Sequence, residues 1–397
     1  MIKFDFNNMV DGFIDKNSFN NLMSRKEEVY SKFSEAYMTG WTKKIEPTEV
    51  NEILRIRDEV LSHSKCLVVI GIGGSFLGSY AVKKMLRPYF NDNSFEVIYA
   101  GTTLSSKYMK ELIEYLSDKE FSINVISKSG TTMETSITYK LLKELMEKKY
   151  SKEDLVKRII ITTDKVKGTL REEVNNMGYP SFEIPDDIGG RYSIMTAAHL
   201  FPLSFNIDLH KFIKGYYNGE SYREEAFKYA ATRVSLYNSG KIIENYVIYE
   251  ENMDFFTEWL KQLYGESEGK KGIGIFPVST VHTRDLHSLG QFIQEGNKII
   301  FETFIKVEES EEILYNNKNL HEVNNIVLDS VRNAHKIGMV PSIEIKLKKI
   351  NEETIGSLMY FYMLGAAFSG FLFNINPFDQ PGVEIYKKEV RDNLGNL

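Results

Sequence analysis

Only one cysteine, Cys66, occurs in the 397-residue sequence, at the start of an apolar stretch. A single cysteine excludes an internal disulfide and a cysteine metal cluster, and a chain without disulfides fits a reducing compartment. A cysteine at the head of an apolar strand usually packs as a small hydrophobic residue. We therefore do not expect Cys66 to act as a nucleophile.

The chain also lacks an excess of positive charge. Its 49 lysines and arginines are outnumbered by 55 aspartates and glutamates, which gives a formal net charge of −6. Nucleic-acid-binding proteins are usually basic, so this balance argues against a nucleic-acid partner. An anionic ligand would need local positive groups to offset the overall field. With 42% hydrophobic and 26% charged residues, the composition is typical of a globular protein long enough for two or more domains.

No export signal is apparent, because the segment MIKFDFNNMVDG carries acidic residues early and has no apolar core. We therefore expect a cytoplasmic protein without a membrane partner. The uncharged run from Ile355 to Phe373 reaches the length of a membrane span. It contains glycines and serines and lacks closely flanking basic residues, so a buried core helix is the favoured interpretation.

Apolar strand-like runs alternate with helical patterns along most of the chain. This alternation predicts an α/β fold with two doubly wound parallel sheets, in which ligands bind at the carboxyl ends of the strands. The predicted strands lie within residues 67–74, 95–101, 122–130, 158–164, 245–251, 271–279, 297–306 and 342–349. The predicted organisation is N-terminal covering helices (1–44), a first α/β domain (45–208), linker helices (209–240), a second α/β domain (241–375), and a C-terminal loop and helix (376–397).

A glycine-rich turn follows the first predicted strand, at Gly71, Gly73, Gly74 and Ser75. A buried strand, a glycine turn and a helix N-terminus together form an anion-binding arrangement, because backbone N–H groups converge there. Neither common nucleotide motif fits. Phe76 stands where a dinucleotide fingerprint needs its third glycine, and Ser79 stands where a P-loop needs lysine. A plain strand–helix turn remains the alternative at this position.

A second strand end is rich in hydroxyl groups. Its candidate anion ligands are Ser127, Lys128, Ser129, Thr131 and Thr132, with Glu134 following on a helix. Together with the turn at Ser75, these groups could surround one phosphate. The alternative is an ordinary serine or threonine helix cap. We favour the phosphate cradle, because one cap does not need this many hydroxyl groups.

Several titratable residues occupy loop or glycine-rich positions later in the chain. Arg191 follows Gly189 and Gly190, and it either faces a ligand or pairs with Asp186 or Asp187. Glu266, His287, Gln380 and Lys387 lie in three further stretches. A carboxylate, a histidine and a lysine beside a phosphate cradle suit proton transfer on a phosphorylated carbonyl compound, and no metal site or activated nucleophile is apparent.

Six ordered motifs carry a resemblance to a known family. They are GIGGSFLGS, SKSGTTMET, GGRYS, QLYGESEGK, DLHSLGQ and NPFDQPGVEIYK. The chain resembles the phosphoglucose isomerase (glucose-6-phosphate isomerase) family over residues 40–390, and most of all its short bacterial form. The resemblance implies two sugar-isomerase (SIS-type) domains and reversible conversion of glucose 6-phosphate to fructose 6-phosphate through ring opening and a cis-enediol. It implies no cofactor and no metal.

The resemblance also implies roles for individual residues. Glu266 matches the base that moves a proton between C1 and C2, and Arg191 matches the arginine that stabilises the cis-enediol. His287 matches the ring-opening histidine, which the neighbouring subunit supplies, so a homodimer is implied; Lys387 matches the lysine paired with that step. The remaining matched positions are the phosphate site at Gly74, Ser75, Ser127, Lys128, Ser129, Thr131 and Thr132, and the substrate-side positions Glu134, Gln262 and Gln380.

Three alternatives stay open on the sequence. The first is an isomerase of another sugar phosphate, such as an amino sugar or mannose phosphate. The second is a non-catalytic sugar-phosphate sensor, which needs the phosphate cradle but no acid–base groups. The third is a secreted binding or signalling protein. The extent of the dimer contacts is also open, because both ends of the sequence are shorter than in larger members of the family.

Overall fold

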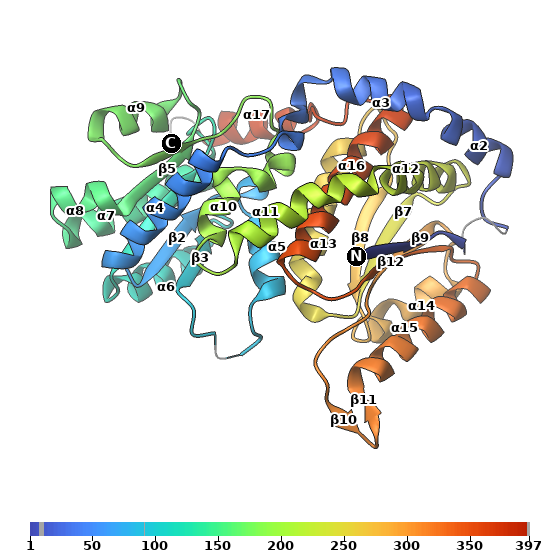
Figure 1. Ribbon diagram of the computed structural model, residues 1–397. Coiled ribbons are helices and arrows are strands. Elements are labelled where there is room, and N and C mark those ends of the chain that lie inside the picture. Colours follow the sequence, from blue (N-terminus) through green and yellow to red (C-terminus); the bar gives the residue numbers. More distant parts are fainter. Residues whose placement is uncertain (8–11, 91, 395–397) are drawn as a thin grey trace.

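Two five-stranded sheets, each covered by helices, lie side by side in the computed structural model (Figure 1). The structure describes residues 1–7, 12–90 and 92–394. Residues 8–11 of the predicted N-terminal segment, residue 91, and residues 395–397 of the predicted C-terminal segment lie outside the described residues. The alternating pattern of the sequence therefore does fold into two α/β units.

The first sheet is entirely parallel, with the strand order β3-β2-β4-β5-β6. All five residues of β2 are buried, as expected for a central strand covered on both faces. Four of the strands were predicted, and the short edge strand β6 was not. The strands are β2 (Cys66–Ile70), β3 (Glu96–Ala100), β4 (Phe121–Ile126), β5 (Ile159–Thr163) and β6 (Ser181–Glu183). The helices around them are α4 (Pro47–His63), α5 (Leu77–Leu86), α6 (Ser106–Ser117), α7 (Met133–Lys149), α8 (Lys152–Arg158), α9 (Thr169–Met177) and α10 (Ala197–Leu203).

The second sheet has the order β1-β12-β9-β7-β8, and four of its strands are the predicted parallel ones. The fifth, β1 (Ile2–Asp5), pairs antiparallel with β12, so the prediction that residues 1–44 form only covering helices is wrong at this point. Four residues are too few to display a strand period in the sequence, and the packing of Ile2 and Phe4 on the core decides the conformation. The other strands are β7 (Ile243–Ile248), β8 (Phe276–Val281), β9 (Ile300–Val307) and β12 (Ser342–Leu347).

Each sheet has one point at which successive strand connections turn from one side of the sheet to the other. In the first sheet β3 and β4 lie on opposite sides of β2, and in the second sheet β8 and β9 lie on opposite sides of β7. Ligands of open α/β sheets bind at such points, beyond the carboxyl ends of the strands. In the second sheet this position is occupied by α15 (Leu320–Ile337), whose Asn324 and Asn325 donate to the carbonyls of Tyr249 and Val307 at 3.4 and 3.1 Å. Only the first sheet carries the glycine-rich and serine-rich loops at its crossover point.

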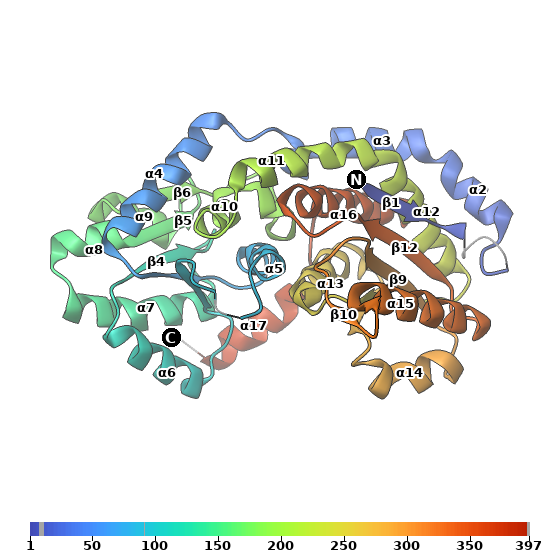
Figure 2. The same cartoon turned by 60° about the horizontal axis from the view of Figure 1, so that its bottom comes forward.

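The predicted core helix is confirmed as α16 (Glu352–Leu372), which begins at an Asn351 side chain that accepts from the Thr354 N–H. By length and composition it could cross a membrane, but 94% of its apolar window is buried inside the protein. It packs against α11 (Leu209–Asn218) and α12 (Arg223–Asn238), which fill the predicted linker, and against α13 (Asp254–Glu268). Figure 2 shows α16 next to α11, α12 and α13.

The remaining elements cover the two units. Helices α2 (Lys16–Ser24) and α3 (Lys26–Glu35) lie over the second unit, and α3 packs on α16. Helix α14 (Leu286–Glu295) lies on the outer side of the same unit, while α17 (Val383–Leu394) returns to the first unit beside α7 (Figure 2). Short elements complete the chain: β10 (Leu314–Tyr315), β11 (Lys318–Asn319), and the 3₁₀ turns η1 (Tyr37–Thr42), η2 (Gly73–Ser75), η3 (Gly190–Met195), η4 (Gly219–Tyr222) and η5 (Glu251–Met253).

The crossing of α11 and α16 generates a prediction at Gly356. A Cβ atom there would come within 2.6 Å of the Phe212 carbonyl oxygen and the Tyr216 nitrogen, which belong to the α11 backbone and cannot rotate away. We expect Gly356→Ala to lower the free energy of unfolding by about 1–3 kcal/mol through overpacking. Urea unfolding measures this change. Ser330→Ala, on the exposed side of α15, is the control and should leave stability nearly unchanged; equal stability of both variants would contradict the prediction.

Candidate active site

The glycine-rich turn lies where three parts of the chain approach one another. Gly73 has a φ of +56°, and a Cβ atom there would come within 3.0 Å of the Gln262 side-chain nitrogen on α13. A Cβ atom on Gly74 would come within 2.4 Å of the Gly190 backbone. Gly73 is therefore favoured by its left-handed conformation, and Gly74 is required by the close approach of the Gly190 backbone. Ser75, half-buried, closes the turn before α5.

A buried histidine that was not predicted, His199 on α10, holds this turn in place. Its Nδ1 accepts from the Ser79 N–H at 3.0 Å, so its proton is on Nε2, which donates to the Gly74 carbonyl at 2.7 Å. The Ser193 hydroxyl lies 3.1 Å from the same Nε2. Burial lowers the pKa of His199 to about 4, against the opposing effect of the bond to Gly74. The only signal in the sequence was a lone histidine within an otherwise apolar helix.

The serine- and threonine-rich loop of residues 127–132 connects β4 to α7. The Ser127 hydroxyl accepts from the Gly130 N–H at 3.1 Å and lies 3.4 Å from the Thr132 hydroxyl. The Ser129 hydroxyl accepts from the N–H and the hydroxyl of Thr131 at 3.2 and 3.0 Å. Thr132 occupies the cap position of α7, but its side chain makes no capping bond within the described chain. Thr132 therefore does not act as an ordinary hydroxyl cap of α7.

Lys128 is the member of this loop that points elsewhere. Its ammonium group pairs with Asp186 at 2.8 Å and donates to the Pro185 carbonyl at 3.3 Å. The expectation that Lys128 supplies its charge to the cradle is thus not supported by its contacts. Asp187 in turn pairs with Lys43 at 2.7 Å. Both aspartates that were considered as partners of Arg191 are occupied by lysines.

Arg191, within η3, is buried and uses all five of its N–H donors. Its Nη1 contacts Glu266 at 3.4 Å and the Gln380 side-chain oxygen at 2.9 Å. Its Nη2 donates to the Pro377 and Asp379 carbonyls at 2.6 and 3.0 Å, and its Nε donates to the Ser267 hydroxyl at 2.9 Å. A guanidinium has five donors in a fixed plane, so these bonds allow one orientation. Arg191 therefore joins the first unit, the end of α13 and the C-terminal loop.

Glu266 was expected at a loop or glycine-rich position, and the structure places it in the last turn of α13. One of its oxygens faces Arg191, and the other accepts from the Gln262 side chain at 3.2 Å. The carbonyl oxygen of the Gln262 side chain is buried and has no partner among the described residues. A buried acceptor without a donor needs an explanation, and a ligand hydroxyl at this position would supply one.

The loop that carries Gln380 is fastened by a second cation, Lys270, which was not predicted either. The Lys270 ammonium pairs with the Asp379 carboxylate at 2.8 Å and donates to the Asn376 carbonyl. Burial lowers the pKa of Lys270. Gln380 is therefore held beside Arg191 by contacts on both sides of its loop.

His287, Lys387 and Glu134 are not joined to this group by any described contact, and neither is the loop of residues 127–132. His287 is exposed in the first turn of α14, on the outer side of the second unit (Figure 2). Lys387 is half-exposed on α17 and pairs with Glu384 at 3.0 Å. Glu134 is half-buried in the first turn of α7. The site within one chain thus contains the glycine turn, Arg191, Glu266, Gln262 and Gln380.

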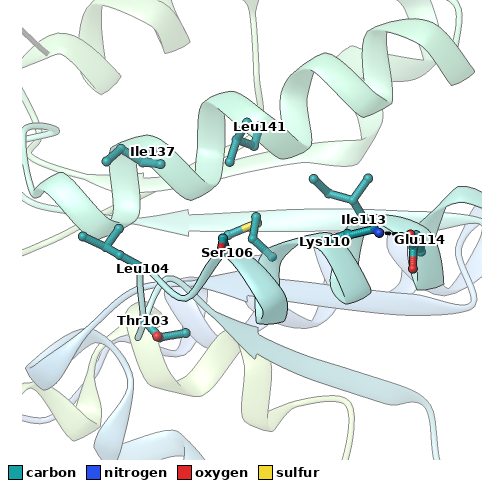
Figure 3. A pocket seen from close by; sticks show the side chains of 9 residues that line it. Thr103, Leu104, Ser106, Lys110, Ile113, Glu114, Ile137 and Leu141 are labelled. Atoms are coloured by element: carbon teal, nitrogen blue, oxygen red, sulfur yellow. Dashed lines mark ion pairs between the residues drawn. The ribbon is translucent and has the colours of Figure 1, made fainter.

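Two cavities lie near the first unit. The smaller, of about 530 Å³, is an open pocket lined mainly by apolar side chains of α6, α7 and the loop before α6, and an ion pair at its edge joins Lys110 to Glu114 on α6 (Figure 3). It contains no predicted site residue. The larger, of about 1570 Å³, lies between α7, α9 and the end of α17 and reaches Gly130 and Thr131. The serine-rich loop therefore borders open space next to α17.

Comparisons with known proteins show the family and the fold of the chain. A family model described as phosphoglucose isomerase matches residues 58–330 and 315–396. A glucose-6-phosphate isomerase from Staphylococcus haemolyticus is 43% identical over 90% of this chain and 86% of its own length, and one from Leptospira biflexa gives the same three values. In fold, the chain matches a solved hypothetical protein from Thermus thermophilus (TM-score 0.86, 24% identity, 100% of both chains). It also matches a glucose-6-phosphate isomerase structure from Chlamydia trachomatis (TM-score 0.83, 20% identity, 99% and 88% of the two chains).

The buried His199 generates a prediction about pH. Its pKa is about 4 in the folded protein and about 6.5 in an unfolded chain, so the unfolded state binds one more proton between these values. The contribution of His199 to the free energy of unfolding should be fully present above about pH 6.5 and be lost as the pH drops toward 4. We expect His199→Gln to reduce the slope of the free energy of unfolding against pH by about 1.4 kcal/mol per pH unit in this range, which corresponds to one proton.

The measurement is urea unfolding of both proteins at several pH values. His282 is also buried, with a pKa lowered to about 4 mainly by burial and then by His335, so part of the slope should persist in the variant. An unchanged slope in His199→Gln would show that His199 is not held neutral by its surroundings.

Proposed function

Because the chain belongs to the phosphoglucose isomerase family, we infer that it interconverts glucose 6-phosphate and fructose 6-phosphate. The family model covers most of the chain, and relatives 43% identical to it are glucose-6-phosphate isomerases. The observation that carries the proposed mechanism is the contact of Arg191 with Glu266 at 3.4 Å, next to the glycine turn. The rest of the proposal assigns roles around this pair.

The substrate phosphate binds between the glycine turn and the loop of residues 127–132. Both loops lie at the crossover point of the first sheet, between β2 and β4. Ser75, Ser127, Ser129, Thr131 and Thr132 contribute hydroxyl groups, and the first turn of α7 contributes unpaired backbone N–H groups. Lys128 neutralises Asp186 instead, so hydroxyl and N–H donors rather than a lysine neighbour the phosphate.

Glu266 is the base that moves the proton. In the open-chain aldose it takes the proton from C2, and the electrons of that C–H bond form the C1–C2 double bond and leave negative charge on the C1 oxygen. A proton then passes from the C2 hydroxyl to the C1 oxygen, and the same carboxyl group protonates C1 as the C2 oxygen becomes the ketose carbonyl. No electrons leave the substrate, so no redox partner is required. A positioned base of this kind contributes roughly 10²–10⁴-fold. The Glu266 side chain is 31% exposed, so a ligand can reach it.

Arg191 stabilises the negative charge that develops on the enediol oxygens. Its bonds to Ser267, Pro377 and Asp379 hold the guanidinium before any substrate arrives. A donor that needs no reorganisation acts mainly in the transition state. Gln262 and Gln380 bind sugar hydroxyls through their side-chain amides, which lie beside Glu266 and Arg191.

Ring opening uses His287 from a second copy of the chain. His287 is exposed in the first turn of α14, and Leu289 and Phe292 of the same helix are 47% and 48% exposed. An apolar helix face next to a candidate catalytic group is what a subunit contact would cover. We accordingly assign a homodimer in which Lys387 assists ring opening, and Glu134 lies on the substrate side. The one cysteine, Cys66, is buried, which fits a cytoplasmic enzyme.

Two of the three alternatives, the sensor and the isomerase of another sugar phosphate, make different demands on the site. A sensor needs the phosphate cradle alone, whereas here a carboxylate, a fixed guanidinium and two glutamine amides surround the neighbouring space. An isomerase of an amino sugar would need groups that distinguish an amine from a hydroxyl at C2. Turnover of the two hexose phosphates against amino-sugar phosphates separates these cases.

The first test is Glu266→Gln. We expect turnover of fructose 6-phosphate, assayed with a chelator present, to fall at least a hundred-fold because the base is lost. Binding of a non-reacting sugar-phosphate analogue should change little, since the phosphate loops are untouched. Glu258→Gln, which breaks a half-exposed pair with Lys261 on the same helix, is the matched control. Wild-type turnover in Glu266→Gln would exclude Glu266 as the base.

The second test is subunit complementation. His287→Ala should lose activity on cyclic substrate while retaining it on an open-chain analogue. When His287→Ala and Glu266→Gln are unfolded and refolded together, random pairing gives mixed dimers with one intact site. About a quarter of wild-type activity should then return, because half of the dimers are mixed and half of their sites are intact. A mixture as inactive as the two separate variants would contradict a site shared between subunits.

A further inference from the structure

A completely buried group of three charges adjoins the end of α13. Arg233 on α12, Glu244 on β7 and Glu268 on α13 are each 0% exposed. The Arg233 Nε donates to Glu244 at 2.6 Å, and its two terminal nitrogens donate to the two oxygens of Glu268, one of them at 3.2 Å. The guanidinium also donates to the Ser369 hydroxyl at 2.8 Å and lies over the Tyr264 ring, 4.1 Å from its centre.

The two carboxylates have different surroundings. Glu244 also accepts from the hydroxyls of Tyr229, Thr303 and Tyr246 at 2.5, 2.6 and 3.0 Å. The carboxylate of Glu268 accepts only from Arg233 within the described part of the chain. Buried ion pairs rarely stabilise a fold more than well-packed apolar residues would. The Glu268 pair therefore calls for a role other than stability.

Glu268 also occupies an unfavourable position on its helix. It is the last residue of α13, where the helix dipole disfavours a negative charge, and the last turn contains no basic residue. Two residues earlier in the same turn is Glu266. Between them, Ser267 accepts from Arg191 and contacts the Tyr192 hydroxyl at 3.0 Å. Consecutive side chains of this turn therefore have different partners. Glu266, the candidate base, and Ser267 contact Arg191, whereas the carboxylate of Glu268 is bound by Arg233.

We propose that the Glu268–Arg233 pair is a positioning unit that fixes the last turn of α13 and thereby the carboxylate of Glu266. The inference rests on the proposed function of Glu266. The end of a helix frays unless its last turn is anchored, and this pair attaches the turn to the interior of the second unit. A misplacement of the base by about 1 Å can lower the rate up to about a hundred-fold.

The buried group carries a net charge of −1, so one of its two carboxylates can be neutralised without leaving a cation unpaired. The group holds two carboxylates and one guanidinium, so replacing either glutamate by glutamine leaves one neutral ion pair. Glu268→Gln should therefore fold, whereas loss of Arg233 would leave two buried carboxylates without a cation. Glu244→Gln is the matched control, because it removes the same charge from the same arginine but on β7, away from α13.

We expect Glu268→Gln to lower kcat for fructose 6-phosphate about tenfold or more, with KM and the affinity for a non-reacting sugar phosphate unchanged. KM and the affinity are assigned mainly to the phosphate loops of the first unit, which neither substitution touches. Glu244→Gln should retain a kcat within about twofold of wild type. A role limited to folding would not separate kcat from KM, nor one glutamate from the other.

The proposal is overturned if both glutamine variants lose kcat equally, if neither does, or if KM rises in Glu268→Gln. If Glu268→Gln does not fold, Glu268→Asp serves instead, because it keeps the charge but shortens the side chain that reaches Arg233. We expect kcat to fall in this variant as well. A wild-type kcat in Glu268→Asp would overturn the proposal. Failure of the proposed function is distinguishable, because it appears as an active Glu266→Gln enzyme. An inactive Glu266→Gln beside a fully active Glu268→Gln would remove this inference alone.

Discussion

The five hydrogen bonds of Arg191 are the constraint on which the site depends. A buried guanidinium is stable only when its donors are satisfied, and here the partners come from two distant stretches of the chain. The 376–380 loop, the end of α13 and the segment after Gly190 are placed relative to one another by this one side chain. Because Gly190 also packs against Gly74, the glycine turn belongs to the same rigid group.

Around that group, the two units make different contributions. The first supplies the two loops at its crossover point, and His199 ties the glycine turn to Ser193, two residues from Arg191. The second supplies α13, whose last turn is fastened on one side to Arg191 and on the other to Arg233. The second crossover point is closed by Asn324 and Asn325, so two similar sheets give one site. The chemistry that we propose is thus located between the units, with phosphate on one and the base on the other.

Some expectations from the sequence were changed by contacts between distant residues. Lys128 stands among hydroxyl residues in the sequence, but Asp186 lies close enough in space to capture it. His199 and Lys270 were overlooked because neither belongs to a local pattern; their importance comes from Gly74 and Asp379, which are far away along the chain. β1 was missed for the same reason, since its partner β12 lies more than three hundred residues later.

The sequence by itself determined eight of the ten strands in the two five-stranded sheets, the buried α16, the two strand-end loops and, through six ordered motifs, the family. These features depend on local periodicity, on glycine and hydroxyl spacing, and on residue identity, all of which can be read along one stretch of chain. The tertiary structure alone decided which polar groups meet: that Arg191 pairs with Glu266 rather than with Asp186 or Asp187, and that Glu268 is held by Arg233. Hydrogen bonds and ion pairs act over a few ångströms, and only the folded chain brings residues 191, 266 and 380 within that range.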